Sequence, residues 1–183
     1  MKWVRRGLLV VIGLPLVLLG VLLAAGLRAD AGKLRADVTI AAGPEAVFAH
    51  FQDPGLLQEW LGVERVQPLT QGAFGVGTRF RMTVSARAGN KTEMDAEVLE
   101  VTPGRQLTLS FRTLPGSDLA LQQVVQFRLE GNRDRSRVAL EGTTRYEGLW
   151  LRVLEPLATA AVERRAERNL GRLKRIAESG RGK

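Results

Sequence analysis

The sequence contains no cysteine and only one histidine, His50. Without thiols the chain forms no disulfide bond, has no thiolate nucleophile and carries no lipid on cysteine. A zinc site built from cysteine and histidine ligands is excluded as well. The sequence also lacks a phosphate-binding loop, a Gly-x-Ser-x-Gly nucleophile motif and a dinucleotide-binding fingerprint. It therefore predicts no metal site, no cofactor and no recognisable set of catalytic residues.

The central part of the chain has no excess of positive charge, although the formal net charge is +8. Residues 1–28 carry four basic and no acidic side chains, residues 29–147 carry 14 and 15, and residues 148–183 carry nine and four. A neutral central part argues against a nucleic-acid partner. The basic residues of the last segment form either a solvated helix face or a surface near anionic lipid head groups.

An uninterrupted apolar run, GLLVVIGLPLVLLGVLLAAGL, occupies residues 7–27. At about 1.5 Å per residue, a helix of this length crosses a hydrocarbon core of about 30 Å. We interpret the run as a single transmembrane helix. The short basic tail before it favours an N-terminus in the cytoplasm and a domain outside, although the basic residues on the two sides of the run are nearly equal in number.

A cleaved signal peptide is the alternative interpretation of this run. Basic residues precede it, and Ala29-Asp30-Ala31 resembles a cleavage site. The apolar part of a signal peptide usually has only about 7 to 15 residues. The length of the run therefore favours a retained membrane anchor.

After the apolar run, the pattern of apolar residues first has the period of a strand and then that of helices. Residues 34–40 alternate between apolar and polar side chains, as in a strand with one buried face. Pro44 suits the first turn of a helix, and Asp53 is a suitable N-cap for a second helix that begins at Pro54. This stretch predicts the order strand, helix, helix.

The sequence up to about residue 147 alternates between short apolar-polar strands and turn signals, which predicts an antiparallel meander. A three-residue loop at residues 88–90 would place Arg81 opposite Glu97 and keep both apolar faces on one side. Residues 149–178 supply a helix to cover that side, and Pro156 either kinks this helix or begins its main part. Its apolar positions are Leu154, Leu157, Ala158, Ala161, Val162, Leu170, Leu173 and Ile176.

Three segments resemble motifs of one superfamily: VTIAAGPEAVFAHFQDPGLLQEWL (38–61), GAFGVGTRF (72–80) and NLGRLKRIAE (169–178). In order and spacing they are similar to START-like proteins, whose bacterial members are commonly labelled SRPBCC or polyketide cyclase/dehydrase proteins. The resemblance covers roughly residues 34–178. It implies an α+β helix-grip fold, with a curved antiparallel sheet of about seven strands around a long C-terminal helix. It also implies an apolar cavity for ligands that range from lipids to polyketides and quinones.

The expected organisation has four parts. A basic tail and transmembrane helix (1–28) are followed by a juxtamembrane linker (29–33), the START-like helix-grip domain (34–178) and a basic tail (179–183).

Several polar residues share the apolar side of the predicted strands, namely Thr92, Thr113, Gln123 and Thr144. Because an unpaired buried hydroxyl or amide costs about 1 to 3 kcal/mol, these groups must pair with one another or face water or a ligand. A ligand cavity accounts for all four, whereas the strand preference of threonine accounts for each alone. The predicted lining of this cavity consists of Trp60, Phe80, Met82, Phe111, Gln123, Gly142 and Tyr146.

These features favour a membrane-anchored, non-catalytic domain that binds or carries a hydrophobic, lipid-like small molecule. Two alternatives stay open. One is an enzyme of the cyclase or dehydratase type, in which Tyr146 or His50 transfers a proton. The other is a scaffold with a filled core, whose basic last helix binds a partner or anionic lipid.

Overall fold

The computed structural model describes residues 32–85, 91–116, 121–146 and 155–180, with side chains in the last segment described from residue 159. The predicted transmembrane segment and Leu154 lie outside these ranges. Within these ranges, no helix has both the length and the apolar character that crossing a bilayer requires.

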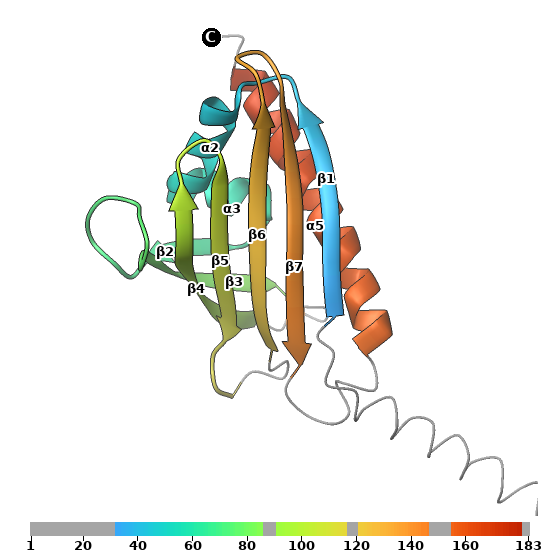
Figure 1. Cartoon of the computed structure of the whole chain (residues 1–183). Coiled ribbons are helices and arrows are strands. Elements are labelled where there is room, and N and C mark those ends of the chain that lie inside the picture. The colour runs from blue at the N-terminus through green and yellow to red at the C-terminus, as the bar shows by residue number, and fades with distance from the viewer. Residues whose placement is uncertain (1–31, 86–90, 117–120, 147–154, 181–183) are drawn as a thin grey trace, which may run out of the picture.

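Seven antiparallel strands form one sheet in the order β1-β7-β6-β5-β4-β3-β2 (Figure 1). Strands β2 to β7 follow one another as a meander, and β1 joins the far edge by pairing with β7. The strands are β1 Gly32–Ile40, β2 Arg65–Pro68, β3 Arg79–Ser85, β4 Lys91–Thr102, β5 Gln106–Thr113, β6 Leu121–Gly131 and β7 Ser136–Tyr146.

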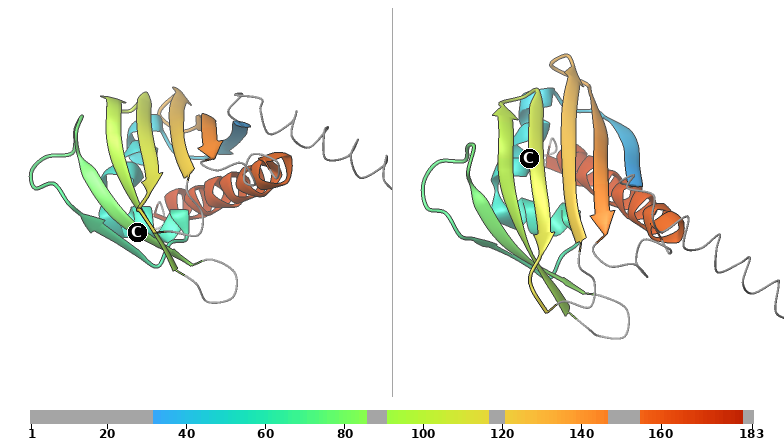
Figure 2. Two further views of the ribbon diagram at one scale, coloured as in Figure 1. Left: turned by 90° about the horizontal axis from the view of Figure 1, so that it is seen from below. Right: turned by 60° about the horizontal axis from the view of Figure 1, so that its bottom comes forward.

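Three helices lie on one side of the curved sheet: α2 (Pro44–Gln52), α3 (Pro54–Leu61) and α5 (Glu155–Ser179). Figure 2 shows the long helix α5 crossing the concave side, with α3 beside it. α5 packs mainly against β1 and α3. This arrangement confirms the predicted helix-grip fold. Pro156 lies in the first turn of α5, so it begins the helix rather than kinking it.

Helix α3 begins after Asp53, as the sequence pattern predicts, and ends at Gly62. The backbone N–H of Leu56 donates to the Asp53 side chain at 2.8 Å, which confirms the predicted N-cap. At the other end, Gly62 adopts a left-handed conformation with φ 60°. A Cβ at Gly62 would meet the guanidinium of Arg172. The glycine therefore supplies the left-handed conformation that ends α3 and leaves room for this side chain of α5.

The register between β3 and β4 differs from the expected one by two residues. Ser85 pairs with Lys91, so Arg81 lies opposite Asp95 rather than Glu97. Arg81 donates to the two carboxylate oxygens of Asp95 at 2.9 and 3.2 Å. A shift of two residues leaves every side chain on its predicted face, because the period of a strand is two.

An aromatic cluster joins the two short helices to the sheet. The ring of Phe51 lies 5.1 Å from that of Trp60 and 5.0 Å from that of Phe127, each pair edge to face. The indole N–H of Trp60 donates to the carbonyl oxygen of His50 at 3.1 Å. The cluster therefore fixes α2 and α3 against β6 with the preferred aromatic geometry and a satisfied indole.

The buried stripe of α5 consists of Ala166, Leu170, Leu173 and Ala177, with the half-buried Val162 preceding it. Ala161, which we expected on the covered side, is exposed. The position of this stripe around the helix leaves Ala161 outside, and exposing a single methyl group costs little. Near the C-terminal end, the Glu178 carboxylate accepts the backbone N–H of Ala41 at 2.8 Å, which fixes α5 to the segment after β1.

Candidate functional site

A cavity of about 260 Å³ lies between the sheet, α3 and α5. Its apolar lining residues are Leu34, Trp60, Leu61, Val63, Met82, Val84, Met94, Phe111, Leu121, Val125, Phe127, Leu140, Val162, Ala166 and Leu170. Its polar lining residues are Ser85, Thr92, Thr113, Gln123, Arg165 and Asn169. A mostly apolar cavity with a few polar groups is typical of small-molecule sites, which commonly measure about 300 to 1,000 Å³.

The cavity walls come from residues that the alternation of the strands turns to one face. Met82, Met94 and Phe111 lie on three neighbouring strands, and their Cα partners place Met82 opposite Met94 and Phe111 opposite Gln123. Trp60 belongs to both the cavity wall and the aromatic cluster. The rigid cluster therefore supports one wall of the cavity.

Four of the seven residues predicted to bind ligand line this cavity, namely Trp60, Met82, Phe111 and Gln123. Phe80, Gly142 and Tyr146 lie outside its lining. The ring of Phe80 is 6.3 Å from that of Phe74, and the buried Tyr146 lies opposite Leu121. Ligand binding by all seven stays a prediction.

The absence of a side chain at Gly142 has a local cause in the sheet. A Cβ at this position would lie 2.8 Å from the carbonyl oxygen of Val124 and 3.2 Å from Cγ2 of Val125, both on the neighbouring strand β6. The close approach of β6 therefore requires glycine here, whereas the sequence analysis assigned this glycine to the cavity lining.

Three of the four inward polar residues on the sheet have partners within the sheet. Thr113 Oγ1 accepts the backbone N–H of Leu121 at 2.9 Å and donates to the carbonyl oxygen of the same residue at 3.3 Å. Gln123 Nε2 donates to Thr144 Oγ1 at 3.1 Å. These pairings satisfy the threonine hydroxyls without a ligand, as buried polar groups require. Gln123 still lines the cavity.

Ser85 at the end of β3 connects the cavity to a charged surface group. Its hydroxyl donates to the Glu64 carboxylate, which also lies 2.7 Å from Lys91 Nζ. The hydrogen bonds from Lys91 and Ser85 lower the pKa of Glu64. The carboxylate therefore stays ionised at neutral pH, and it holds the Ser85 hydroxyl at the cavity wall.

Arg165 of α5 is a cavity-lining residue that the sequence analysis did not identify. Among the described lining residues it alone carries a charge. Its side chain is half-buried, and no ion pair or side-chain hydrogen bond joins its guanidinium to another residue in the described ranges. The signal that would have revealed it is its spacing from Val162 and Asn169, which lie three and four residues away on the same helix face.

The two residues considered for proton transfer lie outside the lining of the cavity. The Nδ1 atom of the half-buried His50 lies 2.9 Å from the carbonyl oxygen of Ala46, one turn earlier in α2. A candidate acid or base must reach its substrate directly or through one water molecule. No described contact places His50 or Tyr146 at the wall of this cavity. In the part of the chain that the structure describes, no group of potential metal ligands is found either.

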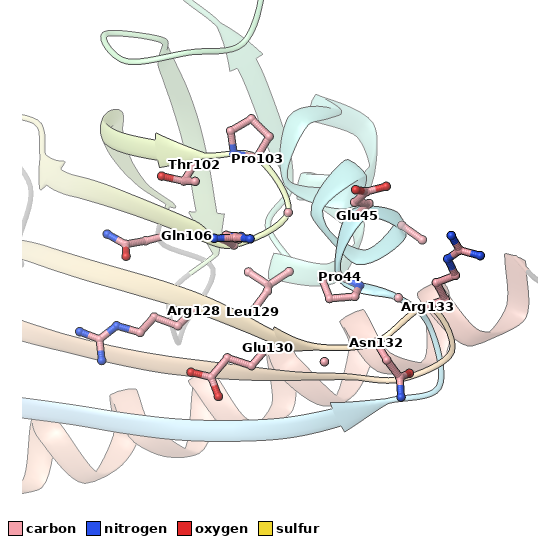
Figure 3. A pocket seen from close by; sticks show the side chains of 15 residues that line it. Pro44, Glu45, Thr102, Pro103, Gln106, Arg128, Leu129, Glu130, Asn132 and Arg133 are labelled. Carbon is pink, nitrogen blue, oxygen red and sulfur yellow. The ribbon is translucent and has the colours of Figure 1, made fainter.

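A second and larger depression, about 1050 Å³ in volume, lies between the N-terminus of α2 and the turns after β4 and β6 (Figure 3). Its lining includes Arg105, Arg128, Arg133, Glu45 and Glu130. Arg128 and Arg133 lie at opposite ends of it and extend away from each other. Charged side chains that point away from each other do not converge on one ligand group. The polar surface of this depression also does not suit a hydrophobic ligand.

The helix-grip fold and the apolar cavity together define a class of small-molecule-binding domains. Residues 31–178 match the family described as "Polyketide cyclase / dehydrase and lipid transport", and the chain belongs to this family. A search of curated protein sequences gave no match.

Solved structures share the fold at low sequence identity. Protein CV1439 from Chromobacterium violaceum is 20% identical with a TM-score of 0.65, over 80% of this chain and 97% of its own. TTHA0849 from Thermus thermophilus is 23% identical with a TM-score of 0.65, over 81% of this chain and 98% of its own. DynU16, of the dynemicin biosynthetic locus, is 17% identical with a TM-score of 0.59, over 81% of this chain and 48% of its own.

The first two of these structures consist almost entirely of the shared domain. The described core of this chain likewise begins at Leu34 and ends at Ala177. Because the described core lies within the part of the chain that these structures share, we expect the fragment 29–183 to fold by itself and choose it for binding and stability measurements.

Proposed function

We propose that the helix-grip domain binds a hydrophobic small molecule in the cavity between the sheet and α5, as a binding or carrier domain. The supporting observation is the cavity itself, in which 15 of the 21 lining residues are apolar. Removing apolar ligand surface from water contributes about 25 cal/mol per Å², and the few polar groups orient the ligand. The family description, which includes lipid transport, is consistent with this role.

The cavity favours binding over the two alternatives. A cyclase or dehydratase needs an acid or base beside the bound substrate, and His50 and Tyr146 do not line the cavity. A scaffold with a filled core would leave no space of about 260 Å³ next to α5. Enzymatic activity remains the second candidate, because the family description also includes polyketide cyclases and dehydrases.

Fluorescence of N-phenyl-1-naphthylamine, a neutral apolar dye, tests the proposed function on the fragment 29–183. We expect saturable binding with enhanced emission, because the dye leaves water for an apolar cavity. Mass spectrometry of the full chain from its native host then identifies the co-purified molecule. A folded fragment that neither takes up the dye nor retains any small molecule would contradict the proposal.

We further propose that residues 7–27 anchor this domain in a membrane, with the domain outside the cytoplasm. The support is the length of the uncharged run, which suffices to cross the bilayer. The full chain should therefore stay in the membrane pellet after washing with alkaline carbonate, and the fragment 29–183 should be released. A mature chain whose N-terminal sequence begins at or near Gly32 would show that the segment is a cleaved signal peptide.

A further inference from the structure

We propose that the ligand of this cavity is an amphipathic anion, whose carboxylate or phosphate head group is bound by Arg165 while its apolar part occupies the cavity. This inference rests on the proposed function and specifies its ligand class. Three observations support it: the position of Arg165 in the lining, the absence of a described counter-charge, and the positive charge around it.

Arg165 lies on the side of α5 that lines the cavity. Val162, three residues earlier, and Ala166, the next residue, line the same cavity, and Asn169 follows one turn later. With its amide oriented so that the nitrogen donates, Asn169 reaches the carbonyl oxygens of Arg165 and Leu61, both at 3.3 Å. Asn169 thereby connects α5 to the end of α3 at the position of Arg165.

The guanidinium of Arg165 has no neutralising partner in the described ranges. The acidic residues nearest to it along the helix, Glu163 and Glu167, form no ion pair with it. Burial, and then the charges of Arg168 and Arg172, lower the pKa of Arg165. A lowered pKa means that the surroundings disfavour the positive charge.

An oxyanion in the cavity would compensate this charge. Arginine remains protonated at neutral pH despite such a shift, and its planar fork fits carboxylate and phosphate oxygens with two parallel hydrogen bonds. The other described lining residues are neutral, so the remainder of the ligand meets mainly apolar surface. The cavity therefore combines one anion-binding group with an apolar compartment, which is the complement of an amphipathic acid.

Displacement of N-phenyl-1-naphthylamine from the fragment 29–183 tests the inference with three compounds of equal chain length: decanoic acid, decyl phosphate and 1-decanol. We expect at least one of the two anions to bind about tenfold or more tightly than the alcohol, equivalent to about 1.4 kcal/mol. In Arg165→Gln this advantage should disappear, while affinity for the dye and for 1-decanol changes less than about twofold. Arg165→Lys should retain part of the advantage, because it keeps the charge but not the fork.

Arg164→Gln is the matched control, because Arg164 is exposed on the same helix and its replacement removes the same charge. The anion advantage should persist in this variant. If all three compounds bind equally well, or if Arg165→Gln retains the anion advantage, the inference is wrong, although the cavity still binds apolar molecules. If the wild-type fragment does not bind the dye, the proposed function fails first. The two failures are therefore distinguishable.

Discussion

Replacing Leu173 with alanine is expected to lower the free energy of unfolding of the fragment 29–183 by about 3 kcal/mol, within the range of about 2 to 5 kcal/mol for buried leucines. Leu173 is 0% exposed and belongs to the core between α5 and the sheet. Its truncation removes apolar burial and leaves a space that the surrounding core closes only in part. The loss would be a large part of a total stability of about 5 to 15 kcal/mol.

Urea denaturation monitored by circular dichroism measures this effect. Arg164→Ala is the control, because Arg164 is exposed on the same helix and its truncation should change stability by no more than about 0.5 kcal/mol. Similar losses in the two variants would show that the inward face of α5 is assigned incorrectly.

Replacing Ala166 with phenylalanine is expected to abolish uptake of N-phenyl-1-naphthylamine while leaving the fragment folded. Ala166 is buried and lines the cavity from α5. An apolar cavity of about 150 Å³ accommodates a benzene molecule, so a phenyl ring fits in a space of about 260 Å³. The ring would then occupy the volume that the dye needs, and we expect the affinity to fall by at least about tenfold.

Stability distinguishes a filled cavity from a disrupted core. A ring that enters existing space should change the free energy of unfolding by less than about 1 kcal/mol, whereas overpacking a closed core costs about 1 to 3 kcal/mol. Ala161→Phe adds the same ring at an exposed position of α5 and should leave dye binding unchanged. A destabilised Ala166→Phe variant, together with a wild-type fragment that never binds the dye, would favour a filled scaffold over a binding domain.

Local patterns in the sequence were sufficient to predict most elements of the domain and their buried faces. The strand at residues 34–40, the Asp53 cap and the alternation of the later strands depend on residues close together in the chain, and all three are confirmed. The edge strand β2 has only four residues, which is too short for an alternating pattern to stand out. The exposure of Ala161 also escaped prediction, because an alanine favours neither side of a helix strongly.

The composition of the cavity lining was only partly predictable. The alternation of side chains along each strand assigned Met82, Phe111 and Gln123 to the covered face, and they line the cavity. This alternation alone does not show how far along a strand the cavity extends. Phe80, two residues from Met82 on the same face, therefore falls outside it. The close approach of β6 to Gly142 was not predicted, because contact with a neighbouring strand leaves no mark in the local sequence.

By itself, the sequence determined the order of the strands and helices, the face that each one buries and the family resemblance. These features follow from short-range periodicity, capping residues and turn residues, which act within a few positions of the chain. Only the tertiary structure decided that Arg81 pairs with Asp95, that a cavity remains beside α5 and that Arg165 lines it without a described counter-charge. Each of these depends on distances between residues far apart in the chain, which are set by how the sheet curves and how closely α5 packs against it.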